Sequence, residues 1–402
     1  MVAVIPLPGV TATMSSDIVH AQVCAALDEH LPRWLSDSSR QRLALLVSGI
    51  IEARSSRPAR MAAAICNRGL SSAQPESIER RLRRAQNDPE LQAHICVDPL
   101  VRQQLQASRS TGLVLLLDPT CQDDRLVLVM ASVWYRGRSL PLAWTSWPAN
   151  QPLTGAGFWE RIEGLLAHVA RLLPAGVAVT WLADRAFGTP HFTDVLARYG
   201  WHWVVRVQGQ TRYRDRTGRE QRLRDLVRGR GQRAKGRGEV FKKQGWRRAS
   251  VVAVWGRRHA APLLLVSDQP IGWEMVGLYR QRYGTEGTYR DYKSDGWELE
   301  QSQVTNVAHV ERLLIGLAWA SWLVTWVGAQ RAAEYLQRPA TGQRRTRPDA
   351  AKYSLFALGL RTFRCDLARW SIHDWHLTDW QAPTWSFQIT QHHLAAYIWA
   401  VH

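Results

Sequence analysis

Four residues in the second half of the chain stand at a spacing suited to chemistry on a phosphodiester. Tyr279, Arg282, Glu286 and Lys293 follow the pattern Y-x2-R-x3-E-x6-K within LYRQRYGTEGTYRDYKSDGW. Their offsets of 0, 3, 7 and 14 predict one stripe of a helix. The carboxylate on that stripe suits a hard divalent cation, and the guanidinium and ammonium suit DNA phosphates, as does nearby Arg290. The Tyr279 ring would stack on the DNA end or hydrogen-bond to it. The alternative is a solvated amphipathic face.

Two further acids end short apolar runs that read as buried strands. Asp118 ends GLVLLLD, and Asp184 ends VAVTWLAD. A bare carboxylate in such a place is costly unless a cation pairs with it. Either acid taken alone is as readily a turn residue or a helix N-cap. Together with Glu286 they predict a three-carboxylate site for two Mg²⁺ ions, with Mn²⁺ as a substitute, of the kind that cleaves phosphodiesters.

The elements around these acids predict an α/β fold with a ribonuclease H-like catalytic core. Residues 109–205 supply its first part, in the order three strands, helix, strand, helix, strand. The second and third strands lie in 125–147 and turn at Arg136-Gly137. Residues 269–337 supply the last part, which holds the catalytic helix and a long apolar helix over 307–336.

Between these parts lies a strongly basic segment. Residues 206–258 hold 18 Arg and Lys against four acids, so this segment carries most of the net charge of +18. Aromatic residues, among them Trp246 and Trp255, are interleaved with the charges. We expect an inserted β domain over 206–268 that binds phosphates, the alternative being a solvated charged loop.

The first 108 residues predict a helical DNA-binding domain. Three short helices fall at 42–53, 58–69 and 75–86. In the third, Arg80, Arg81 and Arg84 lie off the apolar face, as in a helix-turn-helix reader of DNA. An ordinary helical bundle with a solvated arginine face is the alternative.

The remaining features concern the C-terminal region and the compartment. Residues 338–402 read as a linker followed by a helical tail region. The uncharged stretch 313–330 falls just short of a membrane span, so we expect a buried core helix and no membrane partner. Five scattered Cys and an N-terminus without a signal-peptide pattern favour a reducing cytosol. The expected location is the cytoplasm of a bacterium, in association with the nucleoid.

The motifs as a set resemble insertion-sequence DDE transposases with the Y-R-E-K signature, the hairpin-forming cut-and-paste group with a β insertion between the second Asp and the Glu. The likeness covers about residues 40–365, through LLLDPT, LADRAFGTPHFTDVLARYGWHWVVR and the Y-R-E-K segment. It gives Asp118, Asp184 and Glu286 the metal-binding catalytic roles. This sequence departs from the family in having Pro119 where a second acid is common and Thr285 where an Ile is usual.

The resemblance implies a DNA transposase that binds terminal inverted repeats and target DNA and acts as a synaptic homodimer. Hydrolysis would free a 3′-OH, which would attack the opposite strand to form a hairpin; after reopening, the 3′-OH would attack target DNA. Trp246 or Trp255 would hold a flipped base. Two rival hypotheses remain, a catalytically inactive domesticated transposase that only binds DNA, and a ribonuclease H-like nuclease without strand transfer.

Overall fold

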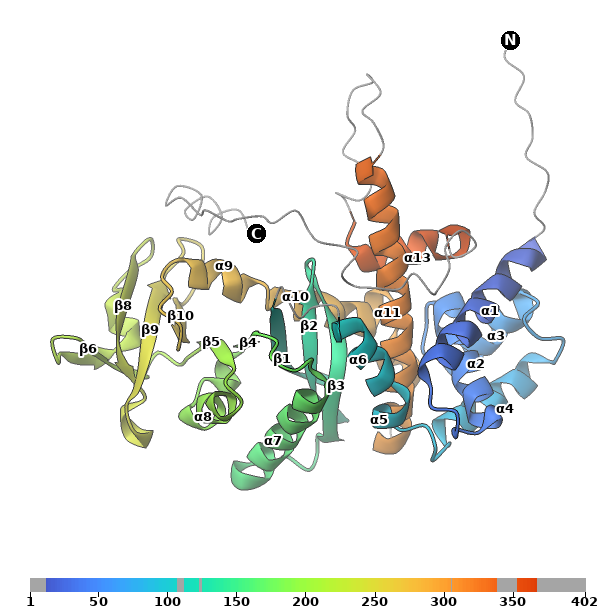
Figure 1. Cartoon of the computed structure of the whole chain (residues 1–402), viewed down its shortest axis with the longest axis horizontal. Helices are drawn as coiled ribbons and strands as arrows, with labels where there is room; N and C mark the ends of the chain where they lie inside the picture. Colours follow the sequence, from blue (N-terminus) through green and yellow to red (C-terminus); the bar gives the residue numbers. More distant parts are fainter. Residues whose placement is uncertain (1–11, 107–111, 123–124, 305, 338–352, 367–402) are drawn as a thin grey trace, which may run out of the picture.

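The chain folds into a mixed α/β structure with one large sheet and helices on both of its faces (Figure 1). It is described by a computed structural model that covers residues 12–106, 112–122, 125–304, 306–337 and 353–366. The predicted linker at 338–348 and most of the C-terminal tail lie outside these residues.

The strands are β1 (Leu113–Gln122), β2 (Leu126–Tyr135), β3 (Arg138–Pro148), β4 (Val179–Ala183), β5 (His202–Arg206), β6 (Arg212–Asp215), β7 (Glu220–Arg222), β8 (Arg233–Val240), β9 (Arg247–Val254) and β10 (Leu263–Ser267). The helices are α1 (Ala12–His30), α2 (Asp37–Ala53), α3 (Pro58–Asn67), α4 (Pro75–Gln86), α5 (Ala93–Cys96), α6 (Asp98–Gln106), α7 (Gly155–Leu172), α8 (Pro190–Arg198), α9 (Glu274–Arg280), α10 (Tyr283–Arg290), α11 (Val307–Gln337) and α13 (Leu355–Asp366).

The first half of the sheet has the predicted ribonuclease H-like arrangement. Its strand order is β3-β2-β1-β4-β5, with β1, β2 and β3 antiparallel to one another and β4 and β5 parallel to β1. The turn between β2 and β3 falls at Arg136 and Gly137, both with positive φ, as predicted. Helices α7 and α8 cover one face, and α9 and α10 lie on the other (Figure 1).

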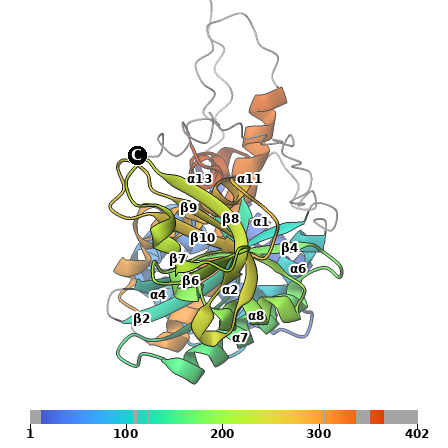
Figure 2. The same ribbon diagram turned by 90° about the vertical axis from the view of Figure 1, so that its left-hand side faces the viewer.

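The basic segment continues this sheet. Strand β10 pairs antiparallel with β5, and the order then runs β10-β9-β8-β6-β7 to the far edge. The predicted β structure is therefore present, and it extends the catalytic sheet to ten strands. Figure 2 shows these added strands from the side.

The N-terminal helices pack around the long helix α11. Helices α2, α3 and α4 contact one another as a three-helix unit, and α11 packs against α2, α4, α5 and β3. By length and composition Val307–Ala332 is apolar enough to cross a membrane, but 94% of its most apolar window is buried inside the protein. This helix serves as a core helix, as the sequence predicted.

Two glycines let α11 and α13 cross at close range. A Cβ on Gly328 would overlap the Leu355 carbonyl oxygen, and one on Gly359 would overlap the Val324 carbonyl oxygen. Both positions therefore exclude any side chain. The crossing joins the C-terminal helix to the core.

Candidate active site

Sheet register places Asp118 and Asp184 side by side. The last parallel pair between β1 and β4 is Leu117 with Ala183, so each Asp is the residue that directly follows this pair in the sequence. The prediction that Asp118 ends its strand was wrong, because β1 continues to Gln122 through its pairing with β2. Asp184 does follow the end of β4, where a 3₁₀ turn begins at Arg185.

The prediction of one continuous helical stripe through the Y-R-E-K residues was also wrong. The segment forms α9, then α10, then a π-helical turn over Asp291–Asp295. Between the two helices the amides of Gln281, Arg282, Gly284 and Thr285 each bond the carbonyl three residues earlier. This tighter winding, followed by the wider π turn, shifts the phase of the side chains from that of a regular α-helix.

Despite that shift, Arg282 and Glu286 lie at the acids of the sheet. The Arg282 guanidinium donates from Nη1 to Asp118 Oδ1 at 3.0 Å and from Nη2 to Glu286 Oε1 at 2.8 Å. The side chains of Arg282 and Asp118 are each 8% exposed, whereas that of Glu286 is 56% exposed. A buried cation therefore bridges one acid of the sheet and the acid of α10.

The remaining members of the predicted pattern, Tyr279 and Lys293, contact different parts of the structure. Tyr279 is buried under α9, and its ring centroid is 5.8 Å from the Arg282 guanidinium carbon. Lys293 donates to the Cys121 carbonyl oxygen at 2.6 Å, near the far end of β1, and pairs with Glu300. Arg290 is exposed on α10. The DNA-binding roles predicted for these three residues stay predictions.

Burial disfavours the ionised form of the acid at the centre of this cluster, Asp118. Burial raises the pKa of Asp118 from its ordinary 3.8 to about 6, the Arg282 guanidinium and the Thr285 hydroxyl lower it, and Asp184 and Glu286 raise it. One carboxylate oxygen of Asp184, Oδ1, is buried without a hydrogen-bond partner. An unpartnered buried carboxylate oxygen is a position that a bound cation would satisfy.

These donors fit divalent metal ions by chemistry, because all three are carboxylates and two face a low-dielectric interior. Within the described parts of the chain, however, no three His, Cys, Asp or Glu side chains stand close enough together to hold an ion. The Arg282 guanidinium takes the charge-balancing position between Asp118 and Glu286. Binding an ion to both acids therefore requires Arg282 to give up at least one of its two bonds.

Two residues that position Asp118 were not identified from the sequence as functional. The Thr285 hydroxyl lies 2.7 Å from Asp118 Oδ2, and the Tyr289 hydroxyl donates to the Asp118 backbone carbonyl at 2.6 Å. Both come from the buried side of α10. In the sequence they stand one residue before and three residues after Glu286, where polar side chains are ordinary on a helix and indicate no function.

The structure places the other predicted DNA contacts away from the acids. Arg80, Arg81 and Arg84 are exposed on α4, opposite the buried Ile78 and Leu82. This agrees with the predicted exposed basic face and leaves the DNA contact itself untested.

The two tryptophans proposed to hold a flipped base lie at opposite ends of β9. The Trp255 Nε1 donates to the His259 carbonyl at 3.0 Å, at the sheet edge nearer the acids. The Trp246 ring lies under the Arg214 guanidinium, 4.5 Å from centroid to carbon, at the far end. Their positions favour Trp255 over Trp246 by proximity to the acids, and the flipped-base role stays a prediction.

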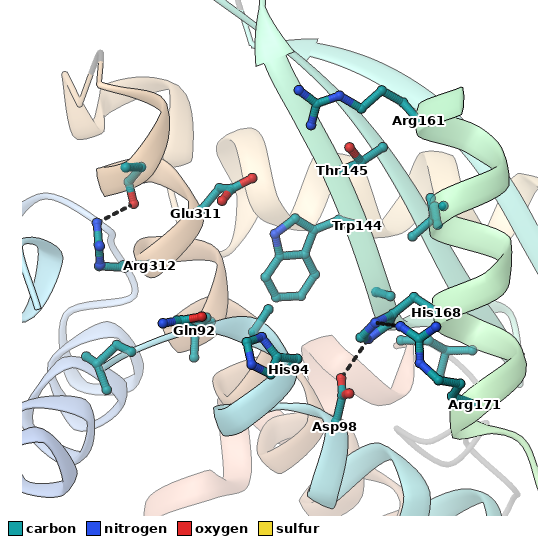
Figure 3. Close-up of a pocket in the computed structure, with 18 of the residues that line it drawn as sticks. Gln92, His94, Asp98, Trp144, Thr145, Arg161, His168, Arg171, Glu311 and Arg312 are labelled. Carbon is teal, nitrogen blue, oxygen red and sulfur yellow. Dashed lines mark hydrogen bonds and ion pairs between the residues drawn. The ribbon is translucent and has the colours of Figure 1, made fainter. Parts of the chain in front are cut away.

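A polar groove of about 1090 Å³ lies on the other side of β3, between α5, α6, α7 and α11 (Figure 3). In it Asp98 pairs with His168 at 2.9 Å, and Arg171 reaches the same imidazole at 3.1 Å. Asp118, Asp184 and Glu286 are absent from its described lining. The groove is a junction between the N-terminal helices and the core.

Comparison with known proteins connects the acids to a family. The family model described as transposase DDE domain matches residues 156–323, which include Asp184 and Glu286. No curated protein matches the sequence. A solved structure described as "Cryo-EM structure of piggyBac transposase synaptic complex with hairpin DNA (SNHP)" is similar at 10% identity and a TM-score of 0.40, covering 96% of this chain and 88% of that one. The family match therefore assigns a transposase DDE domain to residues 156–323 of this chain.

Proposed function

We propose that this protein is a transposase that binds terminal inverted repeats, cuts them and joins the freed ends to target DNA, with Asp118, Asp184 and Glu286 as its catalytic residues. The observation that carries the proposal is that two acids of neighbouring parallel strands lie beside an arginine that bridges one of them to the acid of α10. Asp118 and Asp184 follow one parallel strand pair, and Arg282 links Asp118 to Glu286 from α10.

DDE transposases use divalent metal ions, and we propose two Mg²⁺ ions here, with Mn²⁺ as a substitute. Such ions would supply a deprotonated water and neutralise charge at phosphorus. The carboxylates would hold them, with Asp118 oriented by Thr285 and Tyr289. Arg282, once released from Asp118, would be placed to bind a phosphate of the DNA end by paired hydrogen bonds.

The finer features of the proposal rest on the Y-R-E-K resemblance. They are hairpin intermediates, a homodimer in the synaptic complex, and a place in the bacterial cytoplasm with the nucleoid. Three residues of that pattern lie together, since Arg282 stands beside the Tyr279 ring and bonds Glu286.

The test uses purified full-length protein, Mg²⁺ or Mn²⁺, and the DNA that flanks its gene. We expect nicked, hairpin and target-joined products, all absent with Asp118→Asn and Glu286→Gln. The matched control Asp225→Asn, whose carboxylate pairs with Arg222 at 2.8 Å on the surface, should retain them.

The three hypotheses give different products. Cut ends without joined products would support a nuclease without strand transfer. DNA binding that is unchanged by the two active-site substitutions, together with no cut product from any variant, would support the inactive DNA-binding protein. Either result would overturn the proposal.

A further inference from the structure

One face of strand β8 carries three successive cations, followed on the same face by Glu239, which pairs with Arg214 of β6. In RAKGRGEV, Arg233, Lys235 and Arg237 are exposed, and Ala234, Gly236 and Gly238 alternate with them. Alternation in a strand sends the cations to one face and the small residues to the other. We call the three cations the β8 track.

Register shows which face of the sheet the β8 track occupies. Arg233 pairs with Val254 and Lys235 with Val252, and directly paired residues share a face. Val252 and Val254 belong to the apolar cluster that also holds Leu116, Leu182 and Tyr279. Asp118 and Asp184 lie two residues beyond Leu116 and Leu182, so the β8 track and both acids are on the same face.

The opposite face explains why the track has this alternation. A Cβ on Gly236 would lie 2.5 Å from the Tyr213 hydroxyl oxygen, and one on Gly238 would lie 2.8 Å from a Tyr213 ring carbon. The buried Tyr213 ring therefore fills the space beneath these glycines. This packing fixes the register and holds the cations on the outer side.

Trp273, just before α9, orients two of the cations. The Arg233 guanidinium carbon lies 5.5 Å and the Lys235 Nζ 5.6 Å from its ring centroid. The half-buried ring also packs against the apolar cluster under α9. Cation–π contacts of this kind hold long side chains in place without neutralising them. Trp273 is therefore a positioning residue for the β8 track.

We propose that the β8 track binds the phosphate backbone of the DNA at a set distance from the cleaved bond. The inference rests on the proposed DNA substrate and goes beyond it by naming where that DNA runs. Strand β8 is separated from β4 by four strand-to-strand steps, which is about 19 Å at ordinary spacing. At about 3.4 Å per base pair, the bound phosphates fall roughly six base pairs from the cut.

The direction of β8 agrees with this path. Arg233 lies where β9 ends. The register through β10 and β5 shows that this is the same edge of the sheet at which Asp184 follows β4. Helix α9 begins beside Arg233 and Lys235 and leads to the catalytic helix α10 (Figure 1). The DNA would thus lie along the same side of the sheet from the acids to the track.

The test compares Arg233→Gln/Lys235→Gln with the control Arg216→Gln/Arg219→Gln, which removes the same charge from the exposed β6–β7 turn. Affinity of the full-length protein for a duplex of arbitrary sequence is measured in EDTA at several salt concentrations. Every phosphate that the protein no longer neutralises lowers the slope of log K against log salt by about 0.9, so the slope of the track variant should be smaller by about 1.8. The control slope should stay unchanged.

A second measurement tests the role of Trp273. Trp273→Phe keeps an aromatic face and should keep the wild-type slope, whereas Trp273→Leu should lower it. Ethylation interference on the element's end DNA should show phosphates roughly six base pairs from the cut that matter for wild type and not for the track variant.

Several outcomes would overturn the inference. They are an unchanged slope in the track variant, an equal decrease in the track and control variants, or interference only close to the cut and nowhere further along the duplex. Because binding is measured without metal, DNA cleavage with an unaltered slope would disprove the track alone. A lowered slope with no cleavage in Mg²⁺ would disprove the proposed function and leave the track standing.

Discussion

Replacing Arg282 with glutamine removes the guanidinium that bonds both Asp118 and Glu286. The Asp118 pair is buried on both sides, and removing one member of such a pair costs about 3–5 kcal/mol, because the other charge stays buried and unpaired. The bond to Glu286 adds about 1 kcal/mol or less, since that carboxylate is more than half exposed. In EDTA at pH 8 we expect Arg282→Gln to lower the free energy of unfolding by about 4 kcal/mol.

Divalent metal should reverse this destabilisation. An ion between the acids supplies the positive charge that Arg282 supplied, and it no longer has to displace the guanidinium. Stabilisation by a ligand present at about a hundred times its Kd is about 2.7 kcal/mol. Mg²⁺ or Mn²⁺ should therefore stabilise Arg282→Gln more than wild type and bind it more tightly, as chemical denaturation and calorimetry with inactive protein would measure.

The matched control is Arg138→Gln, which breaks a partly buried pair at 3.0 Å whose acid is Asp291 and not one of the three carboxylates of the site. It should lower stability without changing the response to metal. The reasoning is refuted if Arg282→Gln destabilises the protein by less than about 1 kcal/mol in EDTA. It is equally refuted if metal stabilises wild type, Arg282→Gln and Arg138→Gln to the same extent.

Three further outcomes follow from the structure. The pKa of Asp118 is raised from 3.8 to about 6 in the folded state, so the folded protein holds the Asp118 proton more tightly than the unfolded chain does. In EDTA the free energy of unfolding should therefore fall by roughly 3 kcal/mol as pH rises from about 4 to about 6. Chemical denaturation of Asp118→Asn should lack that fall. Thr285→Val removes the hydroxyl 2.7 Å from Asp118 and should slow cleavage about tenfold, or about 1.4 kcal/mol, with unchanged DNA affinity, and Thr285→Ser should restore the rate. Gly328→Ala should abolish the folded state, since its Cβ would meet the Leu355 carbonyl, whereas Gly164→Ala in open space on α7 should raise the melting temperature.

The sequence predicted most of the core because strand and helix periods are local. The runs that end at Asp118 and Asp184 were identified as buried strands, and parallel pairing of such strands brings their following residues together. Glu286 was identified as the third acid from the Y-R-E-K pattern. The end of β1 was mispredicted because its last residues are set by pairing with β2, and Pro119 within them reads as a strand breaker.

The geometry around Arg282 was beyond the sequence for a different reason. A helical stripe assumes about 3.6 residues per turn throughout, and here the bonds three residues apart before Glu286 and the π turn after it change that number twice. Lys293 consequently contacts the Cys121 carbonyl instead of the acids. Propensity could not show this, since Gly284 and Gly287 lie close to Arg138 of β3 only after the chain has folded.

The basic segment shows how charge density becomes a surface only through register. Counting Arg and Lys predicted phosphate binding but gave no face, because the count is the same for a loop, a hairpin or a sheet. The pairing of β8 with β9 places three cations on the side of the sheet that carries the acids, and the Tyr213 ring under Gly236 and Gly238 prevents the strand from turning over. A shift of one residue would send those cations to the Tyr213 side. Substituting Gly236 with valine should therefore weaken DNA binding as strongly as removing the cations, although it leaves the net charge unchanged.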